Sequence, residues 1–232
     1  MIGRVKEQFK KAFAPIGRSL ASSGVSPNVI TMLGPLVAIA AAMTFVLHQI
    51  LFAAFLMLLA GFVDALDGAV ARASGRTTAF GGVLDSICDR YADAILLFGL
   101  VWGGWCTPFW GVVALVGSLL VSYARARAEA VGVSQLGIGI AERPERLIII
   151  IAATGFQAFT FMRFFPPAPI LFGITLWTEY GVILVAALTH ITVIQRTIFA
   201  YRALAKAPKK REPPLKPADT LGRRPKQPSP LQ

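Results

Sequence analysis

Long apolar runs separated by short polar connections dominate the pattern of this chain. The runs cover about residues 28–48, 51–73, 81–104, 108–131, 146–165 and 170–200. Each run can cross a hydrocarbon core of about 30 Å, which takes roughly 20 helical residues. The pattern therefore predicts an all-α integral membrane protein with six transmembrane helices. Charges inside the second and third runs lower the hydropathy expected for those two helices.

The segment before the first run has a different pattern. Lysines and arginines in residues 3–22 alternate with apolar residues that recur at intervals of three or four positions. The apolar residues are Val5, Phe9, Phe13, Ile16 and Leu20. Because this spacing places them in one stripe along a helix, we predict an amphipathic helix that lies in the membrane interface.

Three segments follow from these patterns. They are an amphipathic juxtamembrane helix at 1–24, a six-helix membrane domain at 25–205 and a cytosolic tail at 206–232 that is basic and rich in proline. We expect the tail to be disordered. Lysine and arginine gather in the amino-terminal segment, in the connections after the second and fourth runs, and in the tail. The positive-inside rule then places both termini and both basic connections in the cytosol, with the protein in the plasma membrane.

Composition narrows the class of protein further. Hydrophobic residues make up 55% of the chain and charged residues 15%, whereas a soluble domain has about 25% charged residues. The net charge of +11 falls at the ends of apolar runs, which suits anionic lipid head groups, so nucleic acid is not expected as a partner. Cys88 and Cys106 lie in apolar surroundings without a metal-binding spacing, so neither a disulfide framework nor a zinc site is predicted.

Five of the twelve acidic residues fall inside the second and third apolar runs. They are Asp64, Asp67, Asp85, Asp89 and Asp93. The first two share one face of a helix, and the other three share one face of the next helix. Because the two helices form a hairpin that turns near Ser74–Ala79, the carboxylates can meet at similar depth, in the cytosolic half of the membrane.

A carboxylate cluster without histidine or cysteine suits a hard cation such as Mg²⁺, Mn²⁺ or Ca²⁺, and its size allows two ions. Two metal ions can stabilise the attacking and the leaving oxygen in phosphoryl transfer. The alternatives are a structural role in pairs with arginine and a pathway for protons or cations through a non-catalytic transporter. The apolar outer halves of the runs, such as Phe52–Leu59 and Leu96–Leu100, argue against a pathway. Asp93 is either an outer member of the site or a partner of a neighbouring helix.

At these residues the chain resembles the CDP-alcohol phosphotransferase family. The family pattern is D-x-x-D-G-x-x-A-R, then eight or nine residues, then G-x-x-x-D-x-x-x-D. Asp64 to Arg72 and Gly81 to Asp89 fill every fixed position, with eight residues between them. The six-helix plan and the amphipathic amino-terminal helix match as well, so the resemblance covers roughly residues 5–203.

The resemblance implies a transferase that moves a lipid-phosphate group from a CDP-lipid to an alcohol and releases CMP. It implies two Mg²⁺ or Mn²⁺ ions bound by Asp64, Asp67 and Asp85, with Asp89 close to them and acting as the general base. It also implies a CDP-lipid pocket that comprises Pro27, Asn28, Thr31, Gly68, Ala71, Arg72 and Arg76. Family members are usually homodimers.

Arginines around the predicted cytosolic mouth indicate an acceptor that itself carries phosphate. The candidates are Arg125, Arg143, Arg146 and Arg196. Arginine binds phosphate through paired donors, which a neutral acceptor would not require. The segments R-A-R-A-E-A and E-R-P-E-R are similar to those of family members that use inositol 1-phosphate and make phosphatidylinositol phosphate or archaetidylinositol phosphate. This similarity leaves open whether the donor is CDP-diacylglycerol or CDP-archaeol.

Two other interpretations of the arginines stay open at this point. The acceptor could be glycerol 3-phosphate, as in the phosphatidylglycerol phosphate synthases of the same family. The arginines could instead be topology signals, or they could pair with Glu129, Glu142 and Glu145.

Overall fold

The computed structural model describes residues 13–135, 137–164 and 177–206, and helices are the only regular structure in these ranges. Residues 13–22 are helical. The long helices of the described part are α2 (Pro27–Val46), α3 (Ile50–Ala73), α4 (Ala79–Trp102), α5 (Pro108–Ala130), α6 (Arg143–Phe164) and α7 (Trp177–Lys206). The predicted fold class is thus confirmed as all-helical for these ranges. The expectations for residues 1–12 and for the tail beyond Lys206 lie outside the described residues.

Five of these helices are long and apolar enough to cross a membrane, namely α2, α3, α5, α6 and α7. Helix α3 can cross a membrane despite its two carboxylates, because its most apolar stretch of 18 residues has a mean hydropathy of 2.1. Helix α4 has 24 residues and a length of about 36 Å, but Asp85, Asp89, Arg90 and Asp93 lower its hydropathy. Among the two charged runs, the lower hydropathy thus excludes only α4 from the helices that are apolar enough to cross a membrane.

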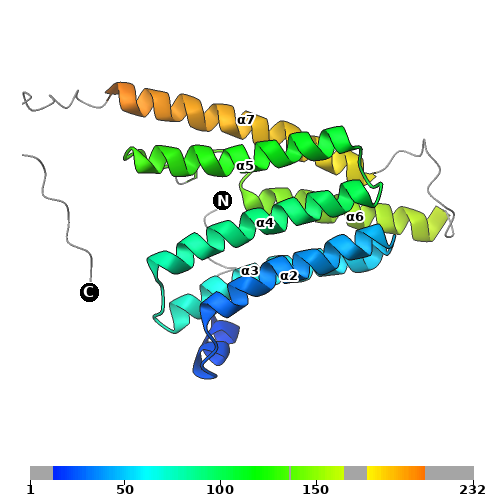
Figure 1. Ribbon diagram of the computed structural model, residues 1–232, viewed down its shortest axis with the longest axis horizontal. Coiled ribbons are helices and arrows are strands. Elements are labelled where there is room, and N and C mark those ends of the chain that lie inside the picture. Colours follow the sequence, from blue (N-terminus) through cyan, green and yellow to red (C-terminus); the bar gives the residue numbers. More distant parts are fainter. Residues whose placement is uncertain (1–12, 136, 165–176, 207–232) are drawn as a thin grey trace, which may run out of the picture.

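Successive helices of the bundle run in opposite directions (Figure 1). Helices α2, α4 and α6 begin, and α3, α5 and α7 end, at one end of the bundle, which we call the polar end. The turn from α3 to α4 needs only Ser74–Thr78, and Gly75 in this turn has φ +65°, a left-handed conformation that glycine adopts at little cost. This tight turn keeps the carboxylates of α3 and α4 close together.

Helix α2 packs on α3 and α4, α5 packs on α7, and α6 packs on both α3 and α7. The main core lies toward the other end of the bundle and contains Phe45, Met57, Leu100 and Val182. There, the indole N–H of Trp105 donates a 2.8 Å hydrogen bond to the carbonyl of Phe45. The apolar contacts thus gather away from the polar end, where the charged side chains meet.

The helical segment 13–22 packs against α3. Phe13 and Leu20 pack against a small cluster that includes Leu66 and Val70. Gly17 faces Ala69 so closely that a Cβ at position 17 would stand 2.9 Å from the Ala69 carbonyl carbon. The apolar stripe predicted for the membrane interface is therefore used in part for contact with α3.

The approach of α2 and α4 depends on Gly99. A Cβ at this position would stand 2.6 Å from the Cα and the Cβ of Ala42. We expect Gly99→Ala to lower the thermal unfolding midpoint in detergent, because overpacking of a close contact costs about 1–3 kcal/mol. Gly155→Ala is the matched control, since a Cβ there meets nothing within 4 Å. An equal midpoint for the two variants would contradict a tight α2–α4 contact.

Candidate active site

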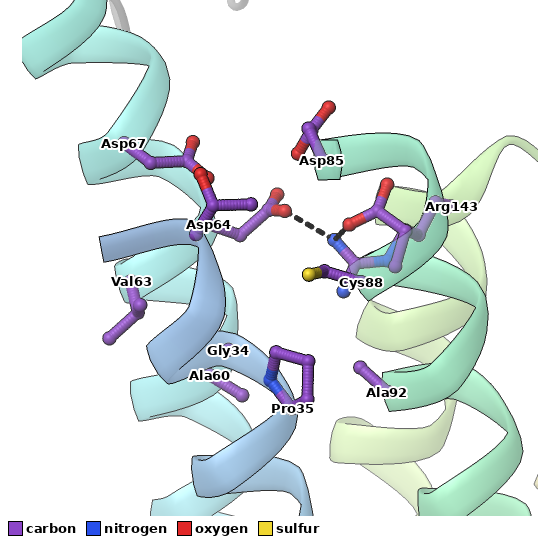
Figure 2. A pocket seen from close by; sticks show the side chains of 12 residues that line it. Gly34, Pro35, Ala60, Val63, Asp64, Asp67, Asp85, Cys88, Ala92 and Arg143 are labelled. Carbon is purple, nitrogen blue, oxygen red and sulfur yellow. Dashed lines mark hydrogen bonds and ion pairs between the residues drawn. The ribbon is translucent and has the colours of Figure 1, made fainter. Parts of the chain in front are cut away.

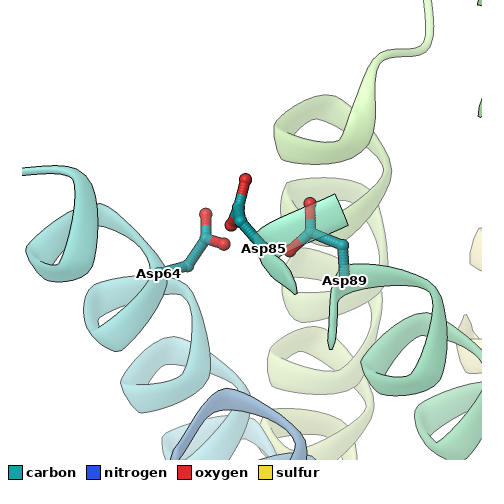
Figure 3. A group of neighbouring side chains, drawn as sticks. All are labelled: Asp64, Asp85 and Asp89. Carbon is teal, nitrogen blue, oxygen red and sulfur yellow. The ribbon is translucent and has the colours of Figure 1, made fainter. Parts of the chain in front are cut away.

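Three carboxylates from two helices face one another at the polar end of the bundle. Asp64 of α3 and Asp85 and Asp89 of α4 each place one oxygen within 4.8 Å of the others (Figure 3). All three residues are half-buried. We call them the three-carboxylate group. A spacing of four residues puts Asp85 and Asp89 on one face of α4, and the short turn after α3 brings that face opposite Asp64.

Asp67 lies beside this group rather than in it. It is one turn beyond Asp64 on α3 and only 8% exposed. Figure 2 shows Asp67 next to Asp64 in a small cavity that α2, α3, α4 and α6 enclose, with Asp85 across from them. Of the four carboxylates assigned to the metal set in the sequence, the structure thus brings three together and places the fourth at the edge.

The donor atoms of the three-carboxylate group suit a hard divalent cation. The group offers carboxylate oxygens alone, and such oxygens are the protein ligands preferred by Mg²⁺ and Mn²⁺. Three negative charges within a few ångströms also require neutralisation in a half-buried site. The residues present therefore fit a divalent metal centre.

Arg143, the first residue of α6, reaches into this group from a position 79 residues beyond Asp64. Its Nη1 lies 2.5 Å from Asp64 Oδ1 and 2.9 Å from Asp89 Oδ1. Its Nε donates to Asp93 Oδ1 at 3.3 Å. The side chain assigned to the acceptor phosphate from the sequence is thus in direct contact with the carboxylates. Arg143 thus pairs with aspartates and not with the glutamates considered as partners in the sequence.

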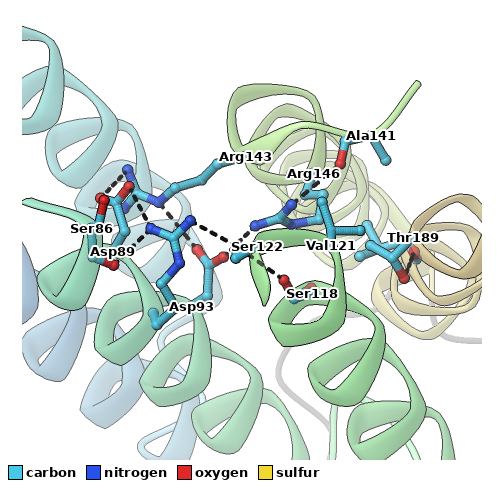
Figure 4. A network of polar contacts seen from close by, with 12 residues as sticks. Ser86, Asp89, Asp93, Ser118, Val121, Ser122, Ala141, Arg143, Arg146 and Thr189 are labelled. Atoms are coloured by element: carbon cyan, nitrogen blue, oxygen red, sulfur yellow. Dashed lines mark hydrogen bonds and ion pairs between the residues drawn. The ribbon is translucent and has the colours of Figure 1, made fainter. Parts of the chain in front are cut away.

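Asp93 connects α4 to α6. Its second carboxylate oxygen accepts a 2.6 Å hydrogen bond from Arg146, and Arg146 also donates to the carbonyl of Ala141 at 3.2 Å (Figure 4). Arg146 is only 4% exposed. Asp93 therefore links α4 to α6, and it holds Arg143 and Arg146 together.

Arg90, next to Asp89 on α4, was not among the site residues predicted from the sequence. Its Nη1 lies 3.4 Å from Asp89 Oδ2, and its Nη2 donates to the hydroxyl of Ser122 on α5 at 2.7 Å. The residue thus connects Asp89 to α5. The sequence did contain a signal for Arg90, because it is a charged residue directly beside a motif carboxylate within an apolar run.

Arg125 and Arg196 have partners outside the three-carboxylate group. Arg125 pairs with Glu129 at 3.0 Å, and both side chains are about two-fifths exposed. Arg196 is buried and donates to the backbone carbonyls of Val121 and Ile138 at 2.7 and 2.9 Å. It also lies 3.6 Å from Glu142. The glutamate pairing considered in the sequence thus occurs for both arginines, and Arg196 ties the α5–α6 connection to α7.

A cavity of about 230 Å³ opens next to the three-carboxylate group, between the first turns of α2 and α4 and the last turns of α3. Six of the seven residues assigned to the CDP-lipid line it, namely Pro27, Asn28, Thr31, Gly68, Ala71 and Arg76. Asp67 and Asp85 line it as well. Arg72 is absent from the lining, and its Nη1 lies 3.1 Å from where a Gly68 Cβ would stand.

The cavity is also bordered by Thr77, Thr78, Gly81 and Gly82 at the start of α4. The hydroxyl of Thr78 accepts a 2.9 Å hydrogen bond from the backbone N–H of Gly81 and caps the helix. Two helix amino-termini, those of α2 and α4, therefore meet at one cavity. Helix amino-termini favour anionic ligands because the helix dipole is positive there and the first N–H groups have no partner within the helix.

The fold and the site define a helical membrane protein that carries an acidic centre beside a cavity suited to an anion. Residues 24–185 match the sequence profile of CDP-alcohol phosphatidyltransferases, and the chain belongs to this family. The resemblance noted in the sequence is thereby confirmed, and the protein is a multi-pass membrane transferase of phospholipid biosynthesis.

Curated relatives match over most of their length. The chain is 41% identical over 207 residues to the archaetidylinositol phosphate synthase of Pyrococcus horikoshii, which covers 88% of this chain and 98% of the relative. It is 36% identical over 197 residues to the phosphatidylinositol phosphate synthase of Mycobacterium tuberculosis, with 81% of this chain and 85% of the relative covered.

Solved structures of the Mycobacterium tuberculosis enzyme share the fold. The one with CDP-DAG bound is 34% identical and has a TM-score of 0.69, and the match covers 82% of this chain and 94% of that chain. The one in complex with manganese and citrate is 35% identical and has a TM-score of 0.68, with 82% and 88% covered.

Proposed function

We propose that this protein transfers a lipid-phosphate group from a CDP-lipid to inositol 1-phosphate and releases CMP. The observation that carries the proposal is that Asp85 belongs both to the three-carboxylate group and to the cavity lined by the expected nucleotide residues. A diphosphate in that cavity would therefore lie against the metal-binding carboxylates. The names of the curated relatives support inositol phosphate as the acceptor, and the CDP-DAG and manganese complexes support the donor and a divalent metal.

Asp64, Asp67, Asp85 and Asp89 are the residues that would hold two Mg²⁺ or Mn²⁺ ions. When bound, the ions neutralise the developing negative charge on the diphosphate. The amino-termini of α2 and α4 bind the same anion from the other side. Asp89 removes the proton of the acceptor hydroxyl as its oxygen attacks the lipid-bearing phosphorus, and CMP leaves with the electron pair of the broken P–O bond.

The acceptor phosphate is bound by arginines on the α6 side of the site. Asp93 holds Arg143 and Arg146 next to the three-carboxylate group, and Arg125 adds a further charge at the more exposed rim. Arg196, whose guanidinium contacts Val121 of α5 and Ile138 of the α5–α6 connection, forms the wall of this acceptor site. Its Nη2, which lies 3.6 Å from Glu142, is the donor proposed for the phosphate. Paired N–H donors of this kind discriminate a phosphorylated alcohol from a neutral one.

We also propose an orientation of the helices in the membrane. Six spans, with α4 as the charged one, place both termini and the polar end in the cytosol, where a water-soluble acceptor meets a lipid donor in the plasma membrane. The protein acts as a homodimer, as the family resemblance implies.

The proposed function is tested by CMP release from purified protein with Mn²⁺, CDP-diacylglycerol or CDP-archaeol, and a panel of acceptors. We expect turnover with inositol 1-phosphate and much slower turnover with glycerol 3-phosphate, inositol and serine, with the lipid product identified by mass spectrometry. Faster turnover with glycerol 3-phosphate would reject the acceptor. Cation flux in liposomes without CMP formation would reject the transferase chemistry of this site.

A further inference from the structure

The guanidinium of Arg143 occupies a defined position among the carboxylates. One nitrogen, Nη1, contacts both Asp64 Oδ1 and Asp89 Oδ1, at 2.5 and 2.9 Å. These two residues belong to the three-carboxylate group that fits a divalent cation. Figures 2 and 4 show the guanidinium in contact with the carboxylate of Asp64 and with those of Asp89 and Asp93.

A metal ion and this guanidinium would share the carboxylates of Asp64 and Asp89. A carboxylate oxygen that ligates a divalent ion at about 2.0–2.6 Å presents its negative charge to that ion. A guanidinium nitrogen in contact with two such oxygens would then lie within a few ångströms of the ion, and the two positive charges would repel each other strongly in a half-buried site. The present contacts of Arg143 Nη1 and a metal ligated by Asp64 and Asp89 therefore oppose each other.

Arg143 has a second anchor that metal binding would leave intact. Its Nε contacts Asp93 Oδ1 at 3.3 Å, and Arg146 holds the other oxygen of Asp93 at 2.6 Å. Asp93 lies outside the three-carboxylate group. The side chain can thus release Asp64 and Asp89 while it keeps its position beside Arg146.

We propose that Arg143 is an internal cation that competes with the divalent metal for Asp64 and Asp89, so that metal binding frees its Nη1 group for an anionic acceptor. The inference rests on the proposed function of the three-carboxylate group as a metal site. Arg143 then alternates between two anionic partners, the aspartate carboxylates and the acceptor phosphate. Metal loading and assembly of the acceptor site are thereby coupled through one side chain.

Competition predicts that loss of the guanidinium tightens metal binding. The experiment titrates the full-length protein in detergent with Mn²⁺ and follows free Mn²⁺ by electron paramagnetic resonance. We expect Arg143→Gln to lower the Mn²⁺ dissociation constant about tenfold, the fold-change that corresponds to one charge-assisted hydrogen-bonding contact of about 1.4 kcal/mol. Arg146→Gln is the matched control, because it removes the same charge three residues along α6 from a side chain that contacts Asp93.

A smaller change for Arg146→Gln than for Arg143→Gln supports direct competition. Equal changes, or no change for Arg143→Gln, would overturn it, since a general loss of positive charge would then explain the result. If wild-type protein binds no Mn²⁺ and releases no CMP, the proposed metal site fails with the inference. If wild-type protein does both while Arg143→Gln leaves the Mn²⁺ affinity unchanged, only the competition fails.

A second measurement needs no variant, so it decides the matter even if Arg143→Gln does not fold. Wild-type protein is treated with phenylglyoxal with and without Mn²⁺, and modified arginines are quantified by mass spectrometry. We expect Mn²⁺ to increase modification of Arg143 relative to Arg146, because its Nη1 group loses Asp64 and Asp89 as partners while Arg146 keeps Asp93. Unchanged or reduced modification of Arg143 would overturn the proposal.

Discussion

Asp89→Asn is expected to lower the rate of CMP release by about 10²–10⁴-fold, the contribution that a positioned general base makes to proton transfer. The amide keeps the size of the side chain but cannot take up the proton of the acceptor hydroxyl. In the structure the carboxylate of Asp89 lies beside that of Asp85 on α4 and faces Asp64 on α3. The measurement is the initial rate with saturating Mn²⁺, CDP-lipid and inositol 1-phosphate.

Asp93→Asn is the matched control for this variant. It makes the same chemical change one turn further along α4, at a carboxylate that holds Arg143 and Arg146 rather than facing the other two carboxylates. We expect it mainly to raise KM for the acceptor, because the arginines proposed to bind the acceptor phosphate lose their anchor. If Asp89→Asn kept a wild-type kcat, or if both variants lost the same kinetic parameter, Asp89 would not be the base.

Local periodicity accounts for the part of this site that could be predicted from the sequence. Positions three or four apart on a helix share a face, so the carboxylates of α3 and α4 could be placed on facing surfaces once a short turn was recognised. The family resemblance, and not periodicity, identified six residues that line the cavity beside them. Each of these contacts spans one hairpin or one adjacent pair of helices.

The contacts of Arg143 could not be predicted in this way. They depend on the packing of α6 against α3, and no periodicity within either helix specifies which residues of two distant helices meet. From the sequence, metal ions were favoured over pairs with arginine as the charges that neutralise the carboxylates. The structure adds an arginine that is remote in the sequence and adjacent in space.

The amino-terminal segment shows the same limit. Its apolar stripe predicts a surface that avoids water, but the pattern does not distinguish lipid from protein as the partner of that surface. In the structure, Phe13 lies 5.2 Å from Phe62 between ring centroids, while Ile16 remains 42% exposed. One stripe thus serves a helix contact on one side and an outward-facing surface on the other.

Asp85→Asn is expected to reduce Mn²⁺ binding and CMP release together, each by at least about 100-fold, because a first ligand matters more than the outer-sphere partners whose loss already costs 10–100-fold. Asp85 is shared by the three-carboxylate group and the cavity, so its charge would act on the proposed metal and, through it, on the diphosphate. Chelation of wild-type protein with EDTA is expected to abolish CMP release as well, and added Mn²⁺ or Mg²⁺ should restore it in wild-type protein alone.

The control for Asp85→Asn is Glu129→Gln, which removes a carboxylate that is paired with Arg125 at an exposed position outside the three-carboxylate group. This variant should bind Mn²⁺ as tightly as wild-type protein, because an exposed ion pair contributes little to the potential at a half-buried site. Full CMP release after chelation would show that the carboxylates do not act through a metal. Arg143 would then be their permanent partner, and the site would need a different explanation for the activation of the diphosphate.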